Sequence, residues 1–539
     1  MRKFVFITGG VLSGLGKGVV TASLGLLLKL QGYRVSLQKI DPYVNVDAGT
    51  MNPYEHGEVF VTYDGKETDL DIGRYERFLN EQLSASNYFT TGQVYWNVIR
   101  QERTGAFLGK TVQVIPHITD EIKRLIRRPL DEVEADIGVI EVGGTVGDIE
   151  GLPFLEALRQ MKDELPKEDT FFVHVTLLPH IGTSDEIKTK PTQHSVKELR
   201  AIGIQPDSIV ARTDLPLPDS VKQKIALFCD VPRENVIEDP TLATIYHAPL
   251  ILHRNRLTEC VTRGLALPKR PTDTSPWAKR IERIDAPARR VSVGIAGKYV
   301  ELKDAYMSIR DAFTHAGAGE DIGVDMHWIS SEDIALHGPE RYLDDLDGLL
   351  IPGGFGHRGI EGKVEAVQYV REREVPFFGI CLGLQCAVIE FARNVLGLEG
   401  ANSTEFEEDT RHPVIGLLDE QLTITQKGGT MRLGNYETTL TPSSTAAACY
   451  ATQTIIERHR HRYEFNPAYR TAFDDAGLRI VGVSGDGLAE IVEMAGHPWF
   501  VGVQFHPEFT SRLLQPHPLF CGFLRACFER KRSSSLSLS

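Results

Sequence analysis

The sequence has little that would suit a secreted, membrane-bound or nucleic-acid-coating protein. Only seven cysteines occur among 539 residues, without regular spacing, which argues against a disulfide framework and fits a reducing compartment. No apolar run reaches the length of a membrane-spanning helix, and residues 1–4 run straight into a predicted strand, with no sign of a secretory signal. The net charge of −14 argues against non-specific binding to nucleic acid or an anionic membrane. We therefore expect a cytoplasmic protein with neither nucleic acid nor membrane as a partner.

A candidate nucleophile lies in the second half of the chain. An apolar run at residues 375–380 leads into Cys381, and a helical pattern follows from Leu382. This order of strand, nucleophile and helix puts one residue at a sharp turn, clear of the sheet. Helix N–H groups there lower a thiol pKa and can donate to an oxyanion. A buried structural cysteine is the alternative, because burial is the commonest fate of a free cysteine.

A candidate base and its orienting group lie far downstream. Residues 500–505 are predicted to form a strand that ends at His506, and the following proline keeps His506 out of a helix. Glu508 is placed to hold the imidazole in the tautomer that a general base needs. The glycine pair 353–354, after an apolar strand, can direct a backbone N–H at an oxyanion. Together with Cys381, these elements resemble the class I glutamine amidotransferases over roughly the last half of the chain.

A phosphate-binding loop is predicted near the N-terminus. The strand 3–10, the glycine-rich segment 11–18 and a helix from about residue 19 to 31 follow the order in which loop N–H groups cradle a phosphate. Lys17 would reach the terminal phosphates, but Gly18 replaces the usual serine or threonine, so carboxylates elsewhere must hold Mg²⁺. The candidates are Asp71, in a period-2 acidic pair, and Glu141, after a buried strand. For the glycine-rich loop the alternative is a tight strand–helix turn. For the acidic pair the alternative is a solvated strand face.

Alternating strands and helices in both halves predict an α/β protein of two domains, each a mostly parallel sheet covered by helices. We expect a first domain at 1–266, a proline-rich linker at 267–290, a second domain at 291–530 and a disordered tail at 531–539. A basic loop at 188–199 suits a second anionic ligand, and Lys224 on a later helix could join it. Taken alone, each of these lysines is more typical of a surface charge.

Motifs along the whole chain, from about residue 2 to about residue 530, resemble the CTP synthases. In the first half they are residues 8–11, 39–43, 45–47, 56–62, 141–150 and 188–194. The resemblance implies a P-loop-type, Rossmann-like amidoligase that uses ATP and Mg²⁺ to phosphorylate O4 of UTP, after which ammonia displaces phosphate to give CTP. The ammonia would come from glutamine in the second domain, through a closed passage that keeps it unprotonated. The resemblance also implies GTP activation, CTP inhibition and a homotetramer, often in filaments, with nucleotide sites between subunits.

Site residues follow from the same resemblance, position by position. In the glutaminase domain Cys381 attacks the amide, His506 transfers protons and Glu508 orients His506. The oxyanion hole would be the N–H groups of Gly354 and Leu382. Glutamine would be held by Gly354, Leu382, Gly383, Leu384, Gln385, Glu405 and Arg462. GTP would be sensed by Arg358, Gly359 and Glu361.

The nucleotide residues implied by the resemblance lie in the first domain. ATP would be bound by Gly14, Leu15, Gly16, Lys17, Gly18, Val19, Lys39, Asp71 and Leu242, with Mg²⁺ on Asp71 and Glu141. UTP would be bound by Ser13, Lys188, Thr189, Lys190, Pro191, Thr192, Gln193 and Lys224. CTP would use the same residues together with Asp148, Ile149 and Glu150.

Two other functions remain open on the sequence alone. One is a glutaminase joined to an unrelated ATPase of the P-loop partitioning type, in which ATP hydrolysis would not depend on UTP. The other is a nucleotide-sensing, filament-forming scaffold with a decayed triad, against which the intact Cys381, His506 and Glu508 argue.

Overall fold

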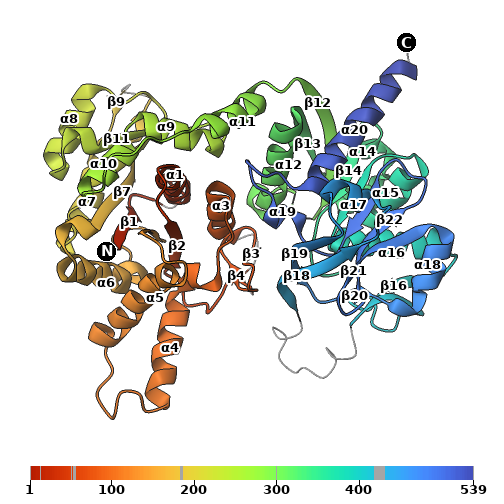
Figure 1. Ribbon diagram of the computed structural model, residues 1–539, viewed down its shortest axis with the longest axis horizontal. Helices are drawn as coiled ribbons and strands as arrows, with labels where there is room; N and C mark the ends of the chain where they lie inside the picture. The colour runs from red at the N-terminus through yellow and green to blue at the C-terminus, as the bar shows by residue number, and fades with distance from the viewer. Residues whose placement is uncertain are drawn as a thin grey trace. The chain divides into compact units, whose positions relative to one another are not determined.

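The computed structural model describes residues 2–12, 14–49, 51, 56–182, 186–298, 300–417 and 431–537. The chain divides into two compact units (Figure 1). The first comprises residues 1–50 and 68–278, and the second comprises residues 51–67 and 279–539. The predicted domain boundaries stay a prediction, but the grouping of residues 51–67 with the second unit was not expected from the sequence.

The first unit is built on a seven-stranded sheet in which the described strands all pair in parallel. In spatial order its strands are β11 (Val236–Pro240), β10 (Ser208–Thr213), β7 (Thr170–Leu177), β1 (Lys3–Gly9), β6 (Ile137–Val142), β2 (Val35–Asp41) and β5 (Tyr88–Thr90). The central strands are buried along nearly their whole length, as expected of a parallel sheet covered on both faces. The loops after β1, β2 and β6 therefore meet at one edge of the sheet, where ligands bind in this architecture.

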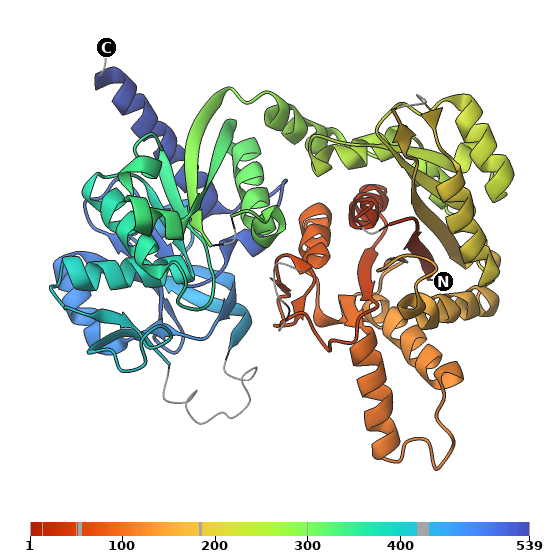
Figure 2. The same cartoon turned by 180° about the vertical axis from the view of Figure 1, so that it is seen from behind.

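Helices of the first unit follow the strands in alternation. They are α1 (Lys17–Leu30), α3 (Leu70–Leu79), α4 (Thr91–Arg103), α5 (Thr119–Glu132), α6 (Leu152–Glu164), α7 (Lys190–Ala201), α8 (Asp219–Cys229), α9 (Ala248–Arg254) and α10 (Leu257–Gly264). A short hairpin joins β8 (His180–Ile181) to β9 (Glu186–Ile187). Both views show α4 projecting from the sheet (Figures 1 and 2).

The second unit is built on a nine-stranded sheet. Its order is β13 (Ile322–Ser330), β12 (Arg289–Gly297), β14 (Gly348–Ile351), β15 (Phe377–Ile380), β23 (Phe500–Val503), β22 (Ala489–Met494), β21 (Leu478–Ser484), β18 (Arg432–Leu440) and β19 (Thr454–His461). The pairings from β13 to β23 are parallel and those from β23 to β19 are antiparallel. The predicted α/β class with two helix-covered sheets is confirmed, and the second sheet carries an antiparallel half.

The remaining elements complete the second unit around two buried apolar clusters. The helices are α12 (Met307–Glu320), α13 (Ser331–His337), α14 (Glu340–Leu343), α15 (Ile360–Glu372), α16 (Leu382–Asn394), α17 (Thr445–Tyr450), α18 (Arg470–Ala476), α19 (Pro507–Thr510) and α20 (Pro518–Ser537). The short strands are β3 (Phe60–Val61), β16 (Ala401–Ser403), β17 (His412–Gly416) and β20 (Glu464–Phe465). Helix α11 (Ser275–Asp285) and strand β4 (Glu67–Thr68) each cross the division between the units.

Two local expectations differ from the structure. The acidic pair at 69–71 does not lie on a strand: Asp69 caps α3 by accepting from the N–H of Asp71, so Asp71 is in the first turn of that helix. The preference of aspartate for the N-cap explains the difference. Helix α20 continues to Ser537, where the sequence favoured a disordered tail. In the described part of the chain no helix is both long and apolar enough to cross a membrane.

Candidate active sites

Cys381 lies at a strained turn between β15 and α16. Its backbone angles are φ 51° and ψ −100°, a conformation that a residue with a side chain rarely adopts. A methyl group on Gly379 would lie 2.7 Å from the backbone of Gly383, so only glycine permits this close return of the chain. The Cys381 N–H donates to the Val503 carbonyl at 2.7 Å, which ties the turn to β23. The predicted strand–nucleophile–helix arrangement is confirmed as geometry.

His506 is brought next to this cysteine. It precedes the first residue of α19, and its Nδ1 lies 2.7 Å from Glu508 Oε1. A methyl group on Gly353 would lie 2.8 Å from Cε1 of His506 and 3.5 Å from Cβ of Cys381, so both side chains border the same glycine. Burial opposes the charged imidazolium, but Glu508 and Cys381 outweigh it and raise the pKa of His506 to about 10. A protonated His506 can give its proton to a departing amine.

The two residues predicted for the oxyanion hole lie close together. Leu382 is the first residue of α16, where N–H groups have no partner within the helix. Gly354 follows β14 in the next turn, and a methyl group on it would lie 3.4 Å from Leu382 Cδ2. Gly354 and Leu382 therefore lie on neighbouring turns beside Cys381, and their role as oxyanion donors stays a prediction.

The predicted glutamine-binding residues gather around the same turn. Gln385 Nε2 donates to the Tyr463 carbonyl at 3.1 Å. Glu405 Oε1 accepts from the Gly356 N–H at 2.7 Å; burial raises the pKa of Glu405, and the positive charge of Arg462 acts on it in the opposite direction. Sequence reasoning missed Gln504, whose Nε2 lies 3.7 Å from Cys381 Sγ. Its place directly after β23 and two residues before His506 is the signal that could have found it.

The predicted GTP-sensing residues lie where α15 begins. Arg358 is 3.8 Å from Glu332, Glu361 is 2.8 Å from Arg393, and Gly359 takes a positive φ of 73° against Ser331.

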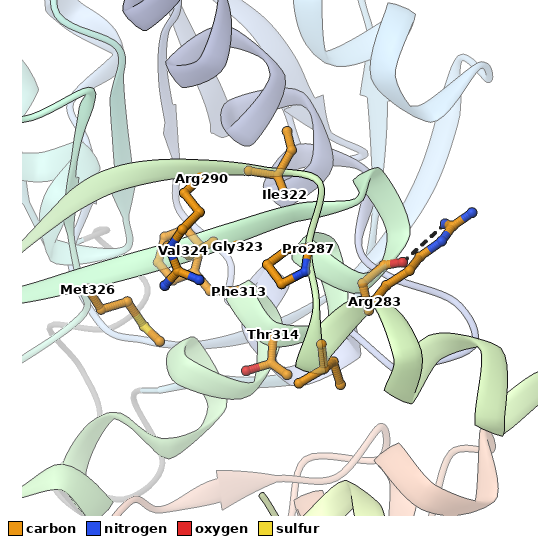
Figure 3. A pocket seen from close by; sticks show the side chains of 12 residues that line it. Arg283, Pro287, Arg290, Phe313, Thr314, Ile322, Gly323, Val324 and Met326 are labelled. Carbon is orange, nitrogen blue, oxygen red and sulfur yellow. Dashed lines mark hydrogen bonds between the residues drawn. The ribbon is translucent and has the colours of Figure 1, made fainter. Parts of the chain in front are cut away.

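A separate pocket of about 150 Å³, lined by α12 and β13, contains none of the predicted residues (Figure 3). There Arg283 donates to the Ala318 and Gly319 carbonyls, so its guanidinium caps the end of α12.

The phosphate loop of the first unit has the predicted form. Gly14 and Gly16 take positive φ angles of 75° and 90°, and Gly16 is the N-cap of α1. The ammonium of Lys17, the first residue of that helix, donates a hydrogen bond to the Gly144 carbonyl. Burial lowers the pKa of Lys17, although nearby carboxylates act against this effect. Ser13 lies outside the described residues.

Carboxylates surround Lys39 beside this loop. Its Nζ lies 2.5 Å from Asp71 Oδ2, 3.0 Å from Glu141 Oε1 and 3.8 Å from Asp41 Oδ1. Burial opposes the charged ammonium, but Asp71 and Glu141 outweigh it, so the pKa of Lys39 lies well above its usual value. Burial would raise the pKa of Asp71, yet Lys39 and Arg74 hold it below its usual value. Sequence reasoning had Asp41 in a motif but gave it no role at the site.

This carboxylate group fits a magnesium ion that is shared with phosphates. Among the described residues, no three His, Cys, Asp or Glu side chains are arranged to hold a metal on their own. Mg²⁺ does not need such a cage, because it is commonly held by one or two carboxylates together with substrate phosphates. Asp71 and Glu141 supply hard oxygen ligands, and the buried Asp41 Oδ2 has no hydrogen-bond partner in the described part of the chain. The donor set therefore suits the ion.

Two of the predicted uridine-nucleotide residues line one pocket. Thr189 and Lys224 border a pocket of about 550 Å³ in the first unit, together with His180, Ile187 and Val221. Lys188 pairs with Glu186 at 2.6 Å, Lys190 lies 5.7 Å from the centre of the Phe228 ring and Gln193 bonds Thr189 at 3.0 Å. Of the residues expected at a CTP site, Asp148 accepts from the Thr145 N–H at 3.1 Å, and Ile149 and Glu150 are exposed. Leu242 is half-buried after β11.

Comparison with known proteins matches the two halves of the chain to two different family models. Residues 3–267 match the family model of the CTP synthase N-terminus, and residues 301–526 match that of class I glutamine amidotransferases. A CTP synthase of Methanocaldococcus jannaschii is 56% identical over 538 residues, covering 98% of this chain and 99% of the relative. The chain belongs to the CTP synthase family. As a member, it is a carbon–nitrogen ligase with a glutaminase domain.

Further relatives give the same result. A CTP synthase of Synechococcus sp. (strain JA-3-3Ab) is 54% identical and covers 100% of this chain and 99% of the relative. Among solved structures, the glutaminase domain of Trypanosoma brucei CTPS with bound acivicin is 36% identical, with a TM-score of 0.42, over 44% of this chain and 94% of that one. The two family models together cover residues 3–267 and 301–526.

Proposed function

We propose that this chain aminates UTP at C4 to give CTP, with ATP and glutamine as co-substrates. The observation that carries the proposal is the presence in one chain of a Cys–His–Glu group at a strained turn and a lysine–carboxylate group at a phosphate loop. The first arrangement suits release of ammonia from an amide. The second suits phosphoryl transfer.

In the glutaminase reaction the Cys381 thiolate attacks the amide carbon of glutamine, and the C–S bond forms as the carbonyl oxygen becomes an oxyanion. The N–H groups of Gly354 and Leu382 would stabilise that charge. Collapse of the intermediate breaks the C–N bond, and protonated His506 gives its proton to the departing ammonia. Water, deprotonated by His506, then hydrolyses the thioester to glutamate.

In the synthetase reaction O4 of UTP attacks the γ-phosphorus of ATP, and ammonia then displaces the phosphate at C4. Lys17 and Lys39 would neutralise charge on the transferring group, and Asp71 and Glu141 would hold Mg²⁺, which screens phosphate charge when bound. The basic segment at 188–193, which opens α7, and Lys224 would hold the UTP triphosphate, with Ser13 and Leu242 contributing to the nucleotide sites. CTP would inhibit by occupying part of the UTP site, and GTP would act near Arg358, Gly359 and Glu361.

The partners we propose are ATP, UTP, glutamine, the activator GTP, the inhibitor CTP and further copies of the chain in a homotetramer. Exposed apolar side chains on and after α4, among them Trp96 and Ile99, support self-association. All seven cysteines are unpaired, and a cytoplasmic location stays a prediction. A closed passage for ammonia also stays a prediction; full exchange of external labelled ammonium into CTP during glutamine turnover would contradict it.

The deciding experiment incubates the protein with ATP, Mg²⁺, UTP and glutamine and separates the nucleotides. We expect CTP to form. A Cys381→Ala variant should lose glutamine-driven CTP formation but keep the ammonia-driven reaction, because it lacks only the nucleophile. A Lys17→Ala variant should lose both. ATP hydrolysis that is independent of UTP, with no CTP formed, would instead favour an unrelated ATPase joined to a glutaminase.

A further inference from the structure

Residues 56–67 belong by sequence to the synthetase half but by structure to the other unit. They lie inside the region that matches the CTP synthase N-terminus, residues 3–267, yet they group with residues 279–539. We call residues 56–67 the crossing segment. Its contacts within the second unit converge on the elements that carry the catalytic triad.

The first part of the crossing segment is fixed to α12. The Glu58 N–H donates to the Asp304 carbonyl at 3.0 Å, and the Ser308 N–H donates to Glu58 Oε2 at 3.0 Å. Ser308 is the second residue of α12, so the carboxylate lies at the positive end of the helix dipole. These bonds anchor the segment before its central residues.

The central residues reach His506 through an aromatic series. The Phe60 ring is fully buried, and its centre lies 5.0 Å from the centre of the Phe509 ring. The Phe509 ring stacks on the His506 imidazole with 4.9 Å between ring centres and 13° between ring planes. Such ring pairs are favourable beyond the area they bury and restrict how the rings turn. Phe60 thus supports the face against which the imidazole rests.

Arg458 connects the crossing segment to the backbone of His506. Its Nη1 donates to the Val61 carbonyl at 3.0 Å and its guanidinium lies 5.5 Å from the centre of the Phe60 ring. The Arg458 carbonyl accepts the His506 N–H at 2.7 Å. The same residue therefore touches the segment with its side chain and the catalytic histidine with its backbone.

The end of the segment approaches the nucleophile. Glu67 Oε1 lies 2.9 Å from Arg460, and the Arg460 carbonyl lies 3.9 Å from Cys381 Sγ. The Asn435 N–H donates to the Tyr63 carbonyl at 2.8 Å, which aligns the segment with β18. The crossing segment is thus separated from His506 by one residue, Phe509, and from Cys381 by one residue, Arg460.

We propose that the crossing segment is a working part of the glutamine-hydrolysing centre, with Phe60 and Arg458 as positioning residues for His506. The inference rests on the proposed glutaminase function. Within the described residues, the imidazole is hydrogen-bonded through Nδ1 to Glu508, and Cys381 is the other titratable group that acts on it. Stacking on Phe509 restrains rotation of the ring about the Nδ1–Glu508 hydrogen bond, and Phe60 packs against Phe509 from the crossing segment. Small displacements of a proton-transfer group reduce rate without weakening substrate binding.

The test is Phe60→Leu in the full-length enzyme, which keeps an apolar side chain but removes the ring. We expect kcat for glutamine hydrolysis to fall by roughly tenfold with KM for glutamine nearly unchanged, as for a misplaced catalytic group. Ammonia-driven CTP formation should stay at the wild-type rate, because that reaction does not use His506. Phe473→Leu is the matched control, since this buried ring packs on Phe391 and Phe465 in the same unit. It should leave both rates unchanged.

A second readout separates positioning from a general loss of structure. The rate of Cys381 alkylation by iodoacetamide, measured against pH and corrected with Cys381→Ala, reports the thiolate that His506 stabilises. Phe60→Leu should move the midpoint of this profile to higher pH, whereas Phe473→Leu should not. An unchanged kcat and midpoint in Phe60→Leu, or an equal loss of the glutamine-driven and ammonia-driven reactions, overturns the proposal. A wild-type enzyme with no glutaminase activity overturns the proposed function instead.

Discussion

At the scale of single residues, the glutaminase site depends on positions where a side chain is missing. Gly353 borders both Cys381 and His506, and Gly379 lets the chain return closely at the nucleophile turn. The strain at Cys381 persists because β15, β23 and α16 hold both sides of the turn. Backbone geometry therefore determines the positions of Cys381 and His506, and Glu508 raises the proton affinity of His506.

Glu508→Gln should make glutamine hydrolysis sensitive to alkaline pH. The raised pKa of His506, about 10, keeps the proton that departing ammonia requires. Without the carboxylate, burial dominates and the pKa of His506 falls. The alkaline limb of kcat/KM should therefore shift to lower pH by about one pH unit or more. Steady-state glutamate release across pH measures the shift. Glu529→Gln, at an exposed carboxylate on α20, should leave the limb in place, and an equal limb in both variants would contradict the role of Glu508.

Asp71→Asn should weaken magnesium use without affecting the glutaminase. Asp71 offers a charged oxygen beside Lys39 and Glu141, and the amide would remove that charge. We expect ammonia-driven CTP formation to need a higher Mg²⁺ concentration and glutamine hydrolysis to be unchanged, measured by Mg²⁺ titration of both reactions. Asp120→Asn, at an exposed position of α5, is the control. An unaltered Mg²⁺ requirement would remove Asp71 from the metal site.

At the scale of elements, the sequence predicted what local pattern determines. The α/β class, the phosphate loop before α1 and the Cys381 turn follow from apolar runs and glycines that are adjacent in the chain. The Asp69–Asp71 pair was placed on a strand because alternation alone cannot show that Asp69 caps a helix. The contact of Phe60 with Phe509 has no local signature at all, because the two residues are far apart in sequence. The roles of Arg458 and Gln504 were likewise visible only in three dimensions.

Gly434→Ala tests the fit between β18 and the crossing segment. Gly434 has φ 92°, and a methyl group on it would lie 2.7 Å from both the Gly65 nitrogen and the Tyr63 carbonyl oxygen. Backbone strain and the clash together should cost about 1–3 kcal/mol and lower Tm. Glutamine hydrolysis should fall with it, because the segment that supports His506 is displaced.

The matched control for that change is Gly487→Ala. Gly487 has φ 85° in the same unit, but a methyl group there meets nothing within 4 Å. It should therefore lower Tm through strain alone and leave glutamine hydrolysis unchanged. Thermal unfolding and glutamate release on both variants decide the matter, and an equal loss of activity would show that the contact with the crossing segment is not responsible.

At the scale of the whole molecule, the chain is not divided where its sequence families are divided. The crossing segment puts part of the synthetase half into the glutaminase unit, and it ends four residues before Asp71, which pairs with Lys39 at the phosphate loop. The two chemistries are therefore joined by a short stretch of backbone in addition to the linker region around α11. A chain cut after the first family region would leave the glutaminase without Phe60 and Glu67, which contact Phe509 and Arg460 beside the triad.

Self-association is the property of the whole molecule that α4 makes testable. Trp96 and Ile99 are 58% and 52% exposed on this projecting helix, and Leu108, Val114 and Ile115 follow as exposed apolar residues. Trp96→Glu should weaken association by about 2 kcal/mol, as removal of a buried interface aromatic does. Light scattering should then show a smaller mass, and ammonia-driven CTP formation should fall if nucleotide sites lie between subunits. Glutamine hydrolysis should persist, because its residues lie within one unit. Leu336→Glu, at an exposed apolar residue of α13, should change neither mass nor activity, and a tetramer that survives Trp96→Glu would place the interface away from α4.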